Sequence, residues 1–191
     1  MIRSQRGDTI IEVILAGTIL SLVTVSMFSV MQRGTASSYD ALERSQVRLE
    51  LNRQSEMLNY FRDEYTKATI NGTAMGANDP GTNWQTIVNT AGPYVATATP
   101  NLESCTPSAQ AFFIRYDTAT SKYMLYGESS YTAASGLPSA GNGIWIEQLN
   151  PSGFAGINRK FHDFYILSCW RTTTAQQQTM SSIVRMYDPS Q

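Results

Sequence analysis

One carboxylate, Glu12, lies at the edge of a long apolar stretch, and it is the first residue whose type and position suggest chemistry. Every other side chain from residue 10 to residue 31 is uncharged, and most are apolar. A charge costs on the order of 3 kcal/mol when such a stretch enters a membrane, and an ionisable residue there marks a functional site by default. Glu12 therefore needs a partner of opposite charge.

The chain has two cysteines, Cys105 and Cys169. In an oxidising compartment they can form one intrachain bridge, and closing so long a loop contributes roughly 4 kcal/mol in the chain-entropy model. The alternative is a pair of buried free thiols. The sequence has no Cys-x-x-Cys pair and no Cys/His cluster, which leaves little case for zinc or redox chemistry. We expect a disulfide.

Catalytic and metal-binding chemistry has few candidates. The single histidine, His162, comes just before a predicted strand, and we expect it to be structural or merely exposed. The chain has no His-Glu-x-x-His, no Gly-x-Ser-x-Gly and no glycine-rich phosphate loop. Asn78 and Asp79 could offer oxygen ligands to calcium, but they lie in an Asn-Asp-Pro-Gly sequence that turn chemistry explains. We expect no enzyme, no metal and no cofactor.

The apolar stretch is long enough to cross a bilayer. Residues 10–31 number 22, against roughly 20 for a membrane span and about 7 to 15 for the core of a signal peptide. A buried core helix and a cleaved secretory signal are the alternatives. Because Arg3 and Arg6 precede the stretch, the positive-inside tendency keeps the N-terminus cytoplasmic and sends the chain after Arg33 outward. The sequence thus predicts a single-pass membrane helix.

The helical pattern continues beyond the membrane segment. Apolar residues recur at steps of four and three, with polar Gln54 interrupting them: Val47, Leu51, Leu58, Phe61 and Tyr65. This spacing places them on one face, which we expect to pack on a following domain. Asp63 and Lys67 have the spacing of an exposed helical ion pair. We predict one nearly continuous helix over residues 9–68, with residues 34–38 as a softer joint.

The rest of the chain changes from loop-rich to strand-rich. Residues 69–108 are rich in Gly, Asn, Thr, Pro and Ser, which predicts an irregular connection with one short helix at residues 84–90. Five strand candidates follow, at residues 109–117, 121–129, 143–149, 163–172 and 181–188, and they suggest an antiparallel meander. The predicted fold class is α+β, with the long N-terminal helix packed on a C-terminal antiparallel sheet.

The charges of the chain are nearly balanced, with 14 Lys plus Arg against 15 Asp plus Glu. A balanced chain has no basic field that would attract a polyanion. We therefore predict no nucleic acid partner.

The residues around Glu12 resemble a processing motif. Arg6-Gly7, then Asp8-Thr-Ile-Ile-Glu12-Val, then an unbroken apolar helix are similar to the cleavage and assembly motif of type IV pilins and of the related pseudopilins of type II secretion. The similarity covers residues 6–31 in sequence and the whole chain in architecture. It implies a leader peptide, residues 1–7, which a prepilin peptidase removes between Gly7 and Asp8, usually with methylation of the new amine on Asp8.

The resemblance also supplies the missing partner of Glu12. Cleavage creates an ammonium group at Asp8, one helical turn away, and in a low-dielectric environment each charge favours the other. In the family the matching glutamate is thought to attract the N-terminus of the neighbouring subunit, which makes Asp8 and Glu12 the implied assembly residues. The alternative for Glu12 is an interfacial carboxylate. Most members have phenylalanine at the position of Asp8, whose carboxylate would compete for the same ammonium.

The implied function is a structural subunit of a type IV pilus-like surface filament, a fimbrium. It would be held in the inner, cytoplasmic membrane and then assembled by the pilus machinery, with copies of itself or related pilins, into an extracellular filament. The alternatives are a minor pilin or type II secretion pseudopilin that primes or tips the filament, and, in another class, a membrane-tethered adhesin or DNA-binding receptor module. The expected segments are a leader at 1–7, an assembly helix at 8–34, its amphipathic continuation at 35–68, an irregular region at 69–108 and a sheet domain at 109–191.

Overall fold

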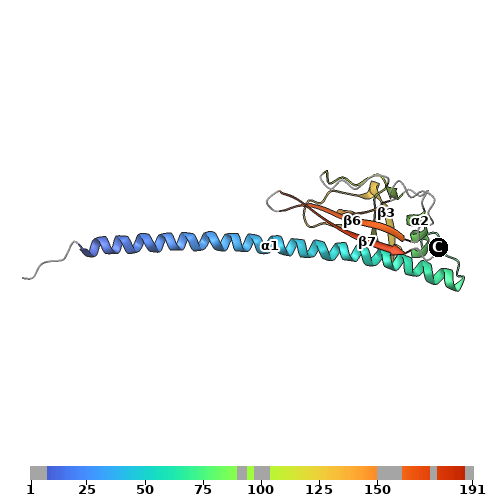
Figure 1. The fold of residues 1–191 in the computed structure, drawn as a ribbon, viewed down its shortest axis with the longest axis horizontal. Coiled ribbons are helices and arrows are strands. Elements are labelled where there is room, and N and C mark those ends of the chain that lie inside the picture. Colours follow the sequence, from blue (N-terminus) through green and yellow to red (C-terminus); the bar gives the residue numbers. More distant parts are fainter. Residues whose placement is uncertain (1–7, 90–93, 97–103, 150–160, 173–175, 188–191) are drawn as a thin grey trace, which may run out of the picture. The chain divides into compact units, whose positions relative to one another are not determined.

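The computed structural model of the chain describes residues 8–89, 94–96, 104–149, 161–172 and 176–187 (Figure 1). The chain divides into two compact units, Met1–Glu43 and Arg44–Gln191. In chain order the elements are α1 (Asp8–Asn71), α2 (Pro80–Val88), β1 (Val95–Ala96), β2 (Phe112–Asp117), β3 (Lys122–Gly127), the 3-10 turn η1 (Glu128–Ser130), β4 (Ser139–Ala140), β5 (Gly143–Leu149), β6 (Phe161–Arg171) and β7 (Gln177–Tyr187). The α+β fold class predicted from the sequence is confirmed.

Helix α1 is continuous over 64 residues, close to the predicted range of 9–68. The softer joint expected at residues 34–38 is helical throughout. Two of its three hydroxyl side chains bond to the helix backbone: Thr35 Oγ1 donates to Gln32 O at 2.9 Å, and Ser38 Oγ donates to Gly34 O at 2.9 Å. These two residues therefore pair their polar groups without breaking the helix.

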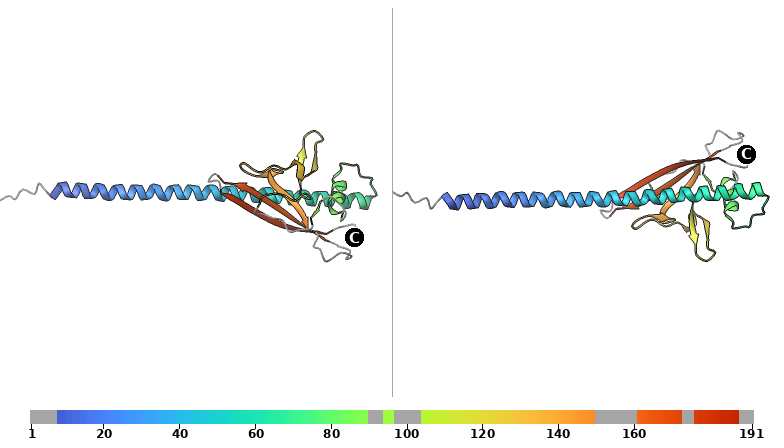
Figure 2. Two further views of the ribbon diagram at one scale, coloured as in Figure 1. Left: turned by 90° about the horizontal axis from the view of Figure 1, so that it is seen from above. Right: turned by 90° about the horizontal axis from the view of Figure 1, so that it is seen from below.

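Within the second unit, the amphipathic part of α1 packs on one face of the sheet. Figure 2 shows the strands crossing this part of the helix. The shared core joins the predicted stripe of α1 (Val47, Leu51, Leu58, Phe61 and Tyr65) to Phe112, Ile114, Ile144, Ile146, Phe164 and Ile166 of the sheet. Burying each large apolar side chain stabilises the fold by about 1.5–3 kcal/mol. The predicted helix stripe is therefore confirmed as the contact that holds helix and sheet together.

The sheet order is β3-β2-β5-β6-β7, with the short strands β1 and β4 parallel to β5 and the other pairs antiparallel. The predicted meander is wrong, because β5 lies beside β2 and not beside β3. Burial explains the order: β2 begins with three fully buried residues, Phe112 to Ile114, whereas every residue of β3 is exposed or half-buried. The more apolar strand occupies the interior of the sheet, and β3 takes its edge.

The short helix predicted at residues 84–90 is present but begins earlier, as α2. Pro80 occupies its first turn, where a missing N–H costs nothing. Gly81 allows α2 to approach α1 closely, because a Cβ there would lie 3.0 Å from Tyr65 Cα. Trp84 and Ile87 then reach the core and are fully buried. The first turn of this helix was not predicted because its residues, Pro80 and Gly81 among them, are typical of loops.

The ion pair predicted between Asp63 and Lys67 is wrong. Lys67 Nζ lies 2.6 Å from Glu64 Oε1, and Asp63 Oδ1 instead accepts a bond from Arg62 Nη2 at 2.8 Å. The hydrogen bond to Glu64 raises the pKa of Lys67. Residues three apart are as close on a helix as residues four apart, so spacing did not distinguish the two carboxylates.

Candidate functional site

The apolar part of α1, from residue 10 to residue 31, is the first candidate site. Each of its large apolar side chains, from Ile10 to Met31, is at least 55% exposed. Among the described residues, α1 is the one helix long and apolar enough to cross a membrane. Apolar surface of this extent is normally covered by lipid or by a protein partner.

Four of the five hydroxyl side chains in this segment have partners within the helix. Thr18, Ser21, Thr24 and Ser26 each donate to the carbonyl oxygen three or four residues earlier, at 2.6–2.8 Å. These side chains therefore add little cost when the segment leaves water, because their polar hydrogens are already bonded. The exposed Glu12 is the remaining strongly polar group of the segment.

The predicted assembly residues lie at the beginning of α1. Asp8 is the first helical residue, and Glu12 follows one turn later on the same side of the helix, since residues four apart share a face. Gly7, at the predicted cleavage site, and the side chain of Asp8 lie outside the described residues. The backbone thus places the start of the helix next to Glu12.

The predicted disulfide between Cys105 and Cys169 is confirmed, with 5.6 Å between the two Cα atoms. It joins the segment before β2 to strand β6. Cys169 belongs to a second apolar cluster with Ala111, Trp145 and Leu167. Because alternate strand residues point to opposite faces, this cluster lies on the face of β6 away from the core that contacts α1.

A buried carboxylate, Glu147, supports the same cluster, and its role is not evident from the sequence. It is 2% exposed. Its Oε1 accepts hydrogen bonds from Trp145 Nε1 at 2.9 Å and from the backbone N–H of Ser108 at 3.0 Å. The carboxylate therefore anchors the segment that follows Cys105, and the disulfide and Glu147 hold this segment together.

We expect Cys105→Ser to lower the free energy of unfolding by roughly 2–5 kcal/mol, since the unfolded chain regains the entropy that the bridge removes. Cys169→Ser should match it, and the double variant should cost no more than either single one. Denaturant unfolding with and without reductant measures the loss, and non-reducing electrophoresis should show a compact parent species that reductant abolishes. Free-thiol labelling of both cysteines in native protein would contradict the bridge.

His162 is buried and structural. Its Nδ1 lies 2.8 Å from Gln148 Nε2, and an amide nitrogen can only donate, so Nδ1 accepts. The ring also meets the edge of Trp84, with 6.3 Å between centroids. We expected His162 to be structural or merely exposed; the second alternative is wrong, because only 7% of its surface is exposed. His162 lies in β6, and its partner Gln148 lies in the neighbouring strand β5.

Asp79, considered above as a calcium ligand, forms an ion pair instead. Its Oδ1 lies 2.8 Å from Lys122 Nζ, and its Oδ2 accepts from the backbone N–H of Gly76 at 2.7 Å. The hydrogen bond from Lys122 holds the pKa of this carboxyl below its usual value. Within the residues that the structure describes, no three His, Cys, Asp or Glu side chains gather as metal ligands would.

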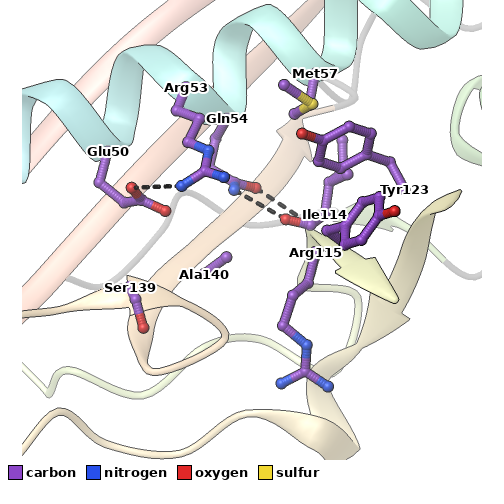
Figure 3. Close-up of a pocket in the computed structure, with 10 residues that line it drawn as sticks. Glu50, Arg53, Gln54, Met57, Ile114, Arg115, Tyr123, Ser139 and Ala140 are labelled. Carbon is purple, nitrogen blue, oxygen red and sulfur yellow. Dashed lines mark hydrogen bonds and ion pairs between the residues drawn. The ribbon is translucent and has the colours of Figure 1, made fainter. Parts of the chain in front are cut away.

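Gln54, which interrupts the apolar stripe of α1, forms hydrogen bonds to the backbone of β2 where β5 does not pair with that strand (Figure 3). Its Nε2 donates to Ile114 O at 2.9 Å, and its Oε1 accepts from Ile114 N at 3.0 Å. Strand β2 pairs with β5 only at Phe112, opposite Ile146. The side-chain amide therefore satisfies the next backbone groups along β2.

Beside Gln54 lies a pocket with a volume of about 200 Å³, formed between α1, β2, β3 and β4 (Figure 3). Its lining includes Glu50, Arg53 and Met57 from α1, Tyr116 and Tyr123 from the hairpin of β2 and β3, and Ser139 from β4. Glu50 and Arg53 form an ion pair with 3.7 Å between Oε2 and Nη1. The pocket combines a charged pair with aromatic rings.

The geometry thus offers two kinds of binding surface. The apolar segment of α1 can contact lipid or other apolar helices, and the pocket can hold a small polar molecule. Comparison of the chain with protein-family models, with curated proteins and with solved structures gave no match.

Proposed function

We propose that this protein is a structural subunit of a type IV pilus-like surface filament, processed by a prepilin peptidase and assembled through α1. The observation that carries the proposal is the segment of residues 10–31, which is apolar and exposed on all sides and has one carboxylate, Glu12, near its start. Lipid would cover this segment in the membrane, and the same segments of other subunits would cover it in the filament.

Two features of the second unit support the proposal. The amphipathic part of α1 packs on a mostly antiparallel sheet, as in the pilin family that the N-terminal sequence resembles. A disulfide fits a domain that is exported to an oxidising compartment. The large apolar side chains of residues 10–31 are exposed, which leaves them available for assembly.

In this function Glu12 selects the register between subunits. The ammonium group created at Asp8 of an incoming subunit pairs with Glu12 of its neighbour inside an apolar filament core. The apolar core tolerates this ion pair because each charge compensates the other. Only one register between the subunits brings the ammonium group and Glu12 together. The same contact repeats from subunit to subunit and does not close, so it generates a fibre.

The proposal is tested by the composition of sheared surface filaments. We expect this protein to be their main component, measured by mass spectrometry against a whole-cell reference. A protein that is nearly undetectable in the filaments but abundant in the membrane would contradict the proposal and favour a minor pilin, a pseudopilin or a membrane-tethered binding module.

Processing gives an independent prediction. Replacement of Gly7 by tryptophan, Gly7→Trp, should leave residues 1–7 attached, because a bulky side chain would not fit where the peptidase accepts glycine, whereas the parent protein should begin at Asp8. N-terminal sequencing of the membrane-held protein measures both.

A matched control is Gly17→Ala, since an added Cβ at Gly17 meets nothing within 4 Å. This variant should be processed like the parent. A parent protein that begins at Met1, or near Ala36, would contradict the assigned cleavage site.

A further inference from the structure

The pocket beside Gln54 has no role in filament assembly as proposed above. We propose that it binds one ring of a neutral saccharide. All of its lining residues belong to the second unit, between residues 50 and 140, and are described by the structure. The inference is independent of the proposed function, because it depends only on this pocket.

An aromatic wall forms one side of the pocket. The rings of Tyr116 and Tyr123 meet edge to face, with 5.3 Å between centroids, and Tyr60 approaches Tyr123 at 6.3 Å. Tyr116 is 45% exposed, so its ring is accessible to a ligand in the pocket. The negative face of an aromatic ring attracts the partly positive C–H groups on the face of a sugar ring.

Polar groups form the opposite side. The ion pair of Glu50 and Arg53 presents carboxylate acceptors and guanidinium donors next to each other, and Ser139 adds a hydroxyl group at the rim. A sugar hydroxyl both donates and accepts, so adjacent hydroxyls can bond to both members of the pair. Figure 3 shows this pair and the ring of Tyr123 on different sides of the pocket.

The charges favour a neutral ligand. The carboxylate of Glu50 and the guanidinium of Arg53 compensate each other at 3.7 Å. Arg115, although it contributes to the lining, turns its guanidinium away and places it over the ring of Tyr126 at 4.6 Å. An anion or a cation would have to break the pair of Glu50 and Arg53, whereas a hydroxylated neutral molecule can bond to both groups.

The size and the floor of the pocket favour a single ring. Its volume of about 200 Å³ is below the roughly 300–1,000 Å³ of sites for drug-sized ligands. The floor is preformed, because Gln54 is bonded in both directions to Ile114, which is 1% exposed. A preformed floor of paired groups binds a ligand without a cost for ordering the site.

The test uses the full chain in a detergent without a sugar headgroup. The probes are the methyl glycosides of glucose, galactose, mannose and N-acetylglucosamine, titrated by saturation-transfer NMR. We expect at least one to bind saturably with a dissociation constant on the order of 1 mM, since so few atoms limit the affinity. Tyr116→Ala should weaken binding about tenfold, because the stacked ring is lost.

Two variants separate binding from folding. Tyr116→Phe keeps the ring and should bind within about twofold of the parent. Tyr187→Ala removes a more exposed tyrosine, from β7, and should leave binding unchanged. Absence of saturable binding for all four glycosides would overturn the proposal. So would equal binding by Tyr116→Ala and the parent, or binding of inorganic phosphate or a short peptide in place of the glycosides.

Discussion

Glu12→Val should give a protein that is processed and inserted normally but is missing from filaments. Removal of the only charge among residues 10–31 leaves membrane insertion unimpaired or improves it by up to about 3 kcal/mol. Assembly loses the partner of the ammonium group on the incoming subunit, and one half of a buried pair left alone costs about 3–5 kcal/mol. Membrane levels, N-terminal sequencing and the composition of sheared filaments measure the three steps separately.

Glu12→Gln is the closer control for the role of the charge, because it keeps the shape and loses only the ionised group. It should assemble as poorly as Glu12→Val. Asp8→Phe should assemble at least as well as the parent, since it introduces the residue found at this position in most members of the family that the N-terminal sequence resembles and leaves Glu12 without a competing carboxylate.

Efficient filaments from Glu12→Val would leave one explanation based on charge, namely that Asp8 pairs with the ammonium instead. The double variant Asp8→Asn with Glu12→Val tests it, because neither carboxylate remains. Filaments from the double variant would refute the electrostatic register.

The long helix and the main strands could be predicted because each leaves a periodic signal in the sequence. The stripe of α1 from Val47 to Tyr65 repeats over five turns, so a single polar interruption did not hide it. The main strands, β6 among them, alternate or concentrate apolar residues over six residues or more. The two-residue strands β1 and β4 have no such signal, and they were missed.

The parts that could not be predicted depend on contacts between residues far apart in the chain. The position of β5 beside β2 follows from the burial of whole strands, which the local pattern does not determine. The role of Gln54 depends on a backbone 60 residues away, and that of Glu147 on Trp145 and on Ser108, 39 residues away. For Gln54 the one available signal was a polar residue at a position of the stripe where an apolar one was expected.

Replacing that polar residue should cost the second unit about as much stability as loss of the disulfide. Gln54→Met keeps the length and volume of the side chain but removes both hydrogen bonds to Ile114, leaving a buried N–H and a buried carbonyl unpaired. Each of these two groups costs about 1–3 kcal/mol, so the free energy of unfolding should fall by roughly 2–6 kcal/mol. Urea unfolding followed by tryptophan fluorescence measures the loss, since Trp84, Trp145 and Trp170 all lie in this unit.

The matched control is Gln46→Met, the same substitution at an exposed position of α1, which should change stability by less than about 0.5 kcal/mol.

Gln54→Glu should make the stability of the second unit depend on pH. Burial raises the folded pKa of the introduced carboxyl above its unfolded value of about 4.3, so its neutral form is the one that fits. The neutral acid can both donate to and accept from Ile114, and stability relative to the parent should therefore recover as pH falls towards 4 and be lost as pH rises through the folded pKa. An equal loss for Gln46→Met and Gln54→Met, or a Gln54→Glu deficit that does not change with pH, would show that the amide is not acting as the strand neighbour of β2.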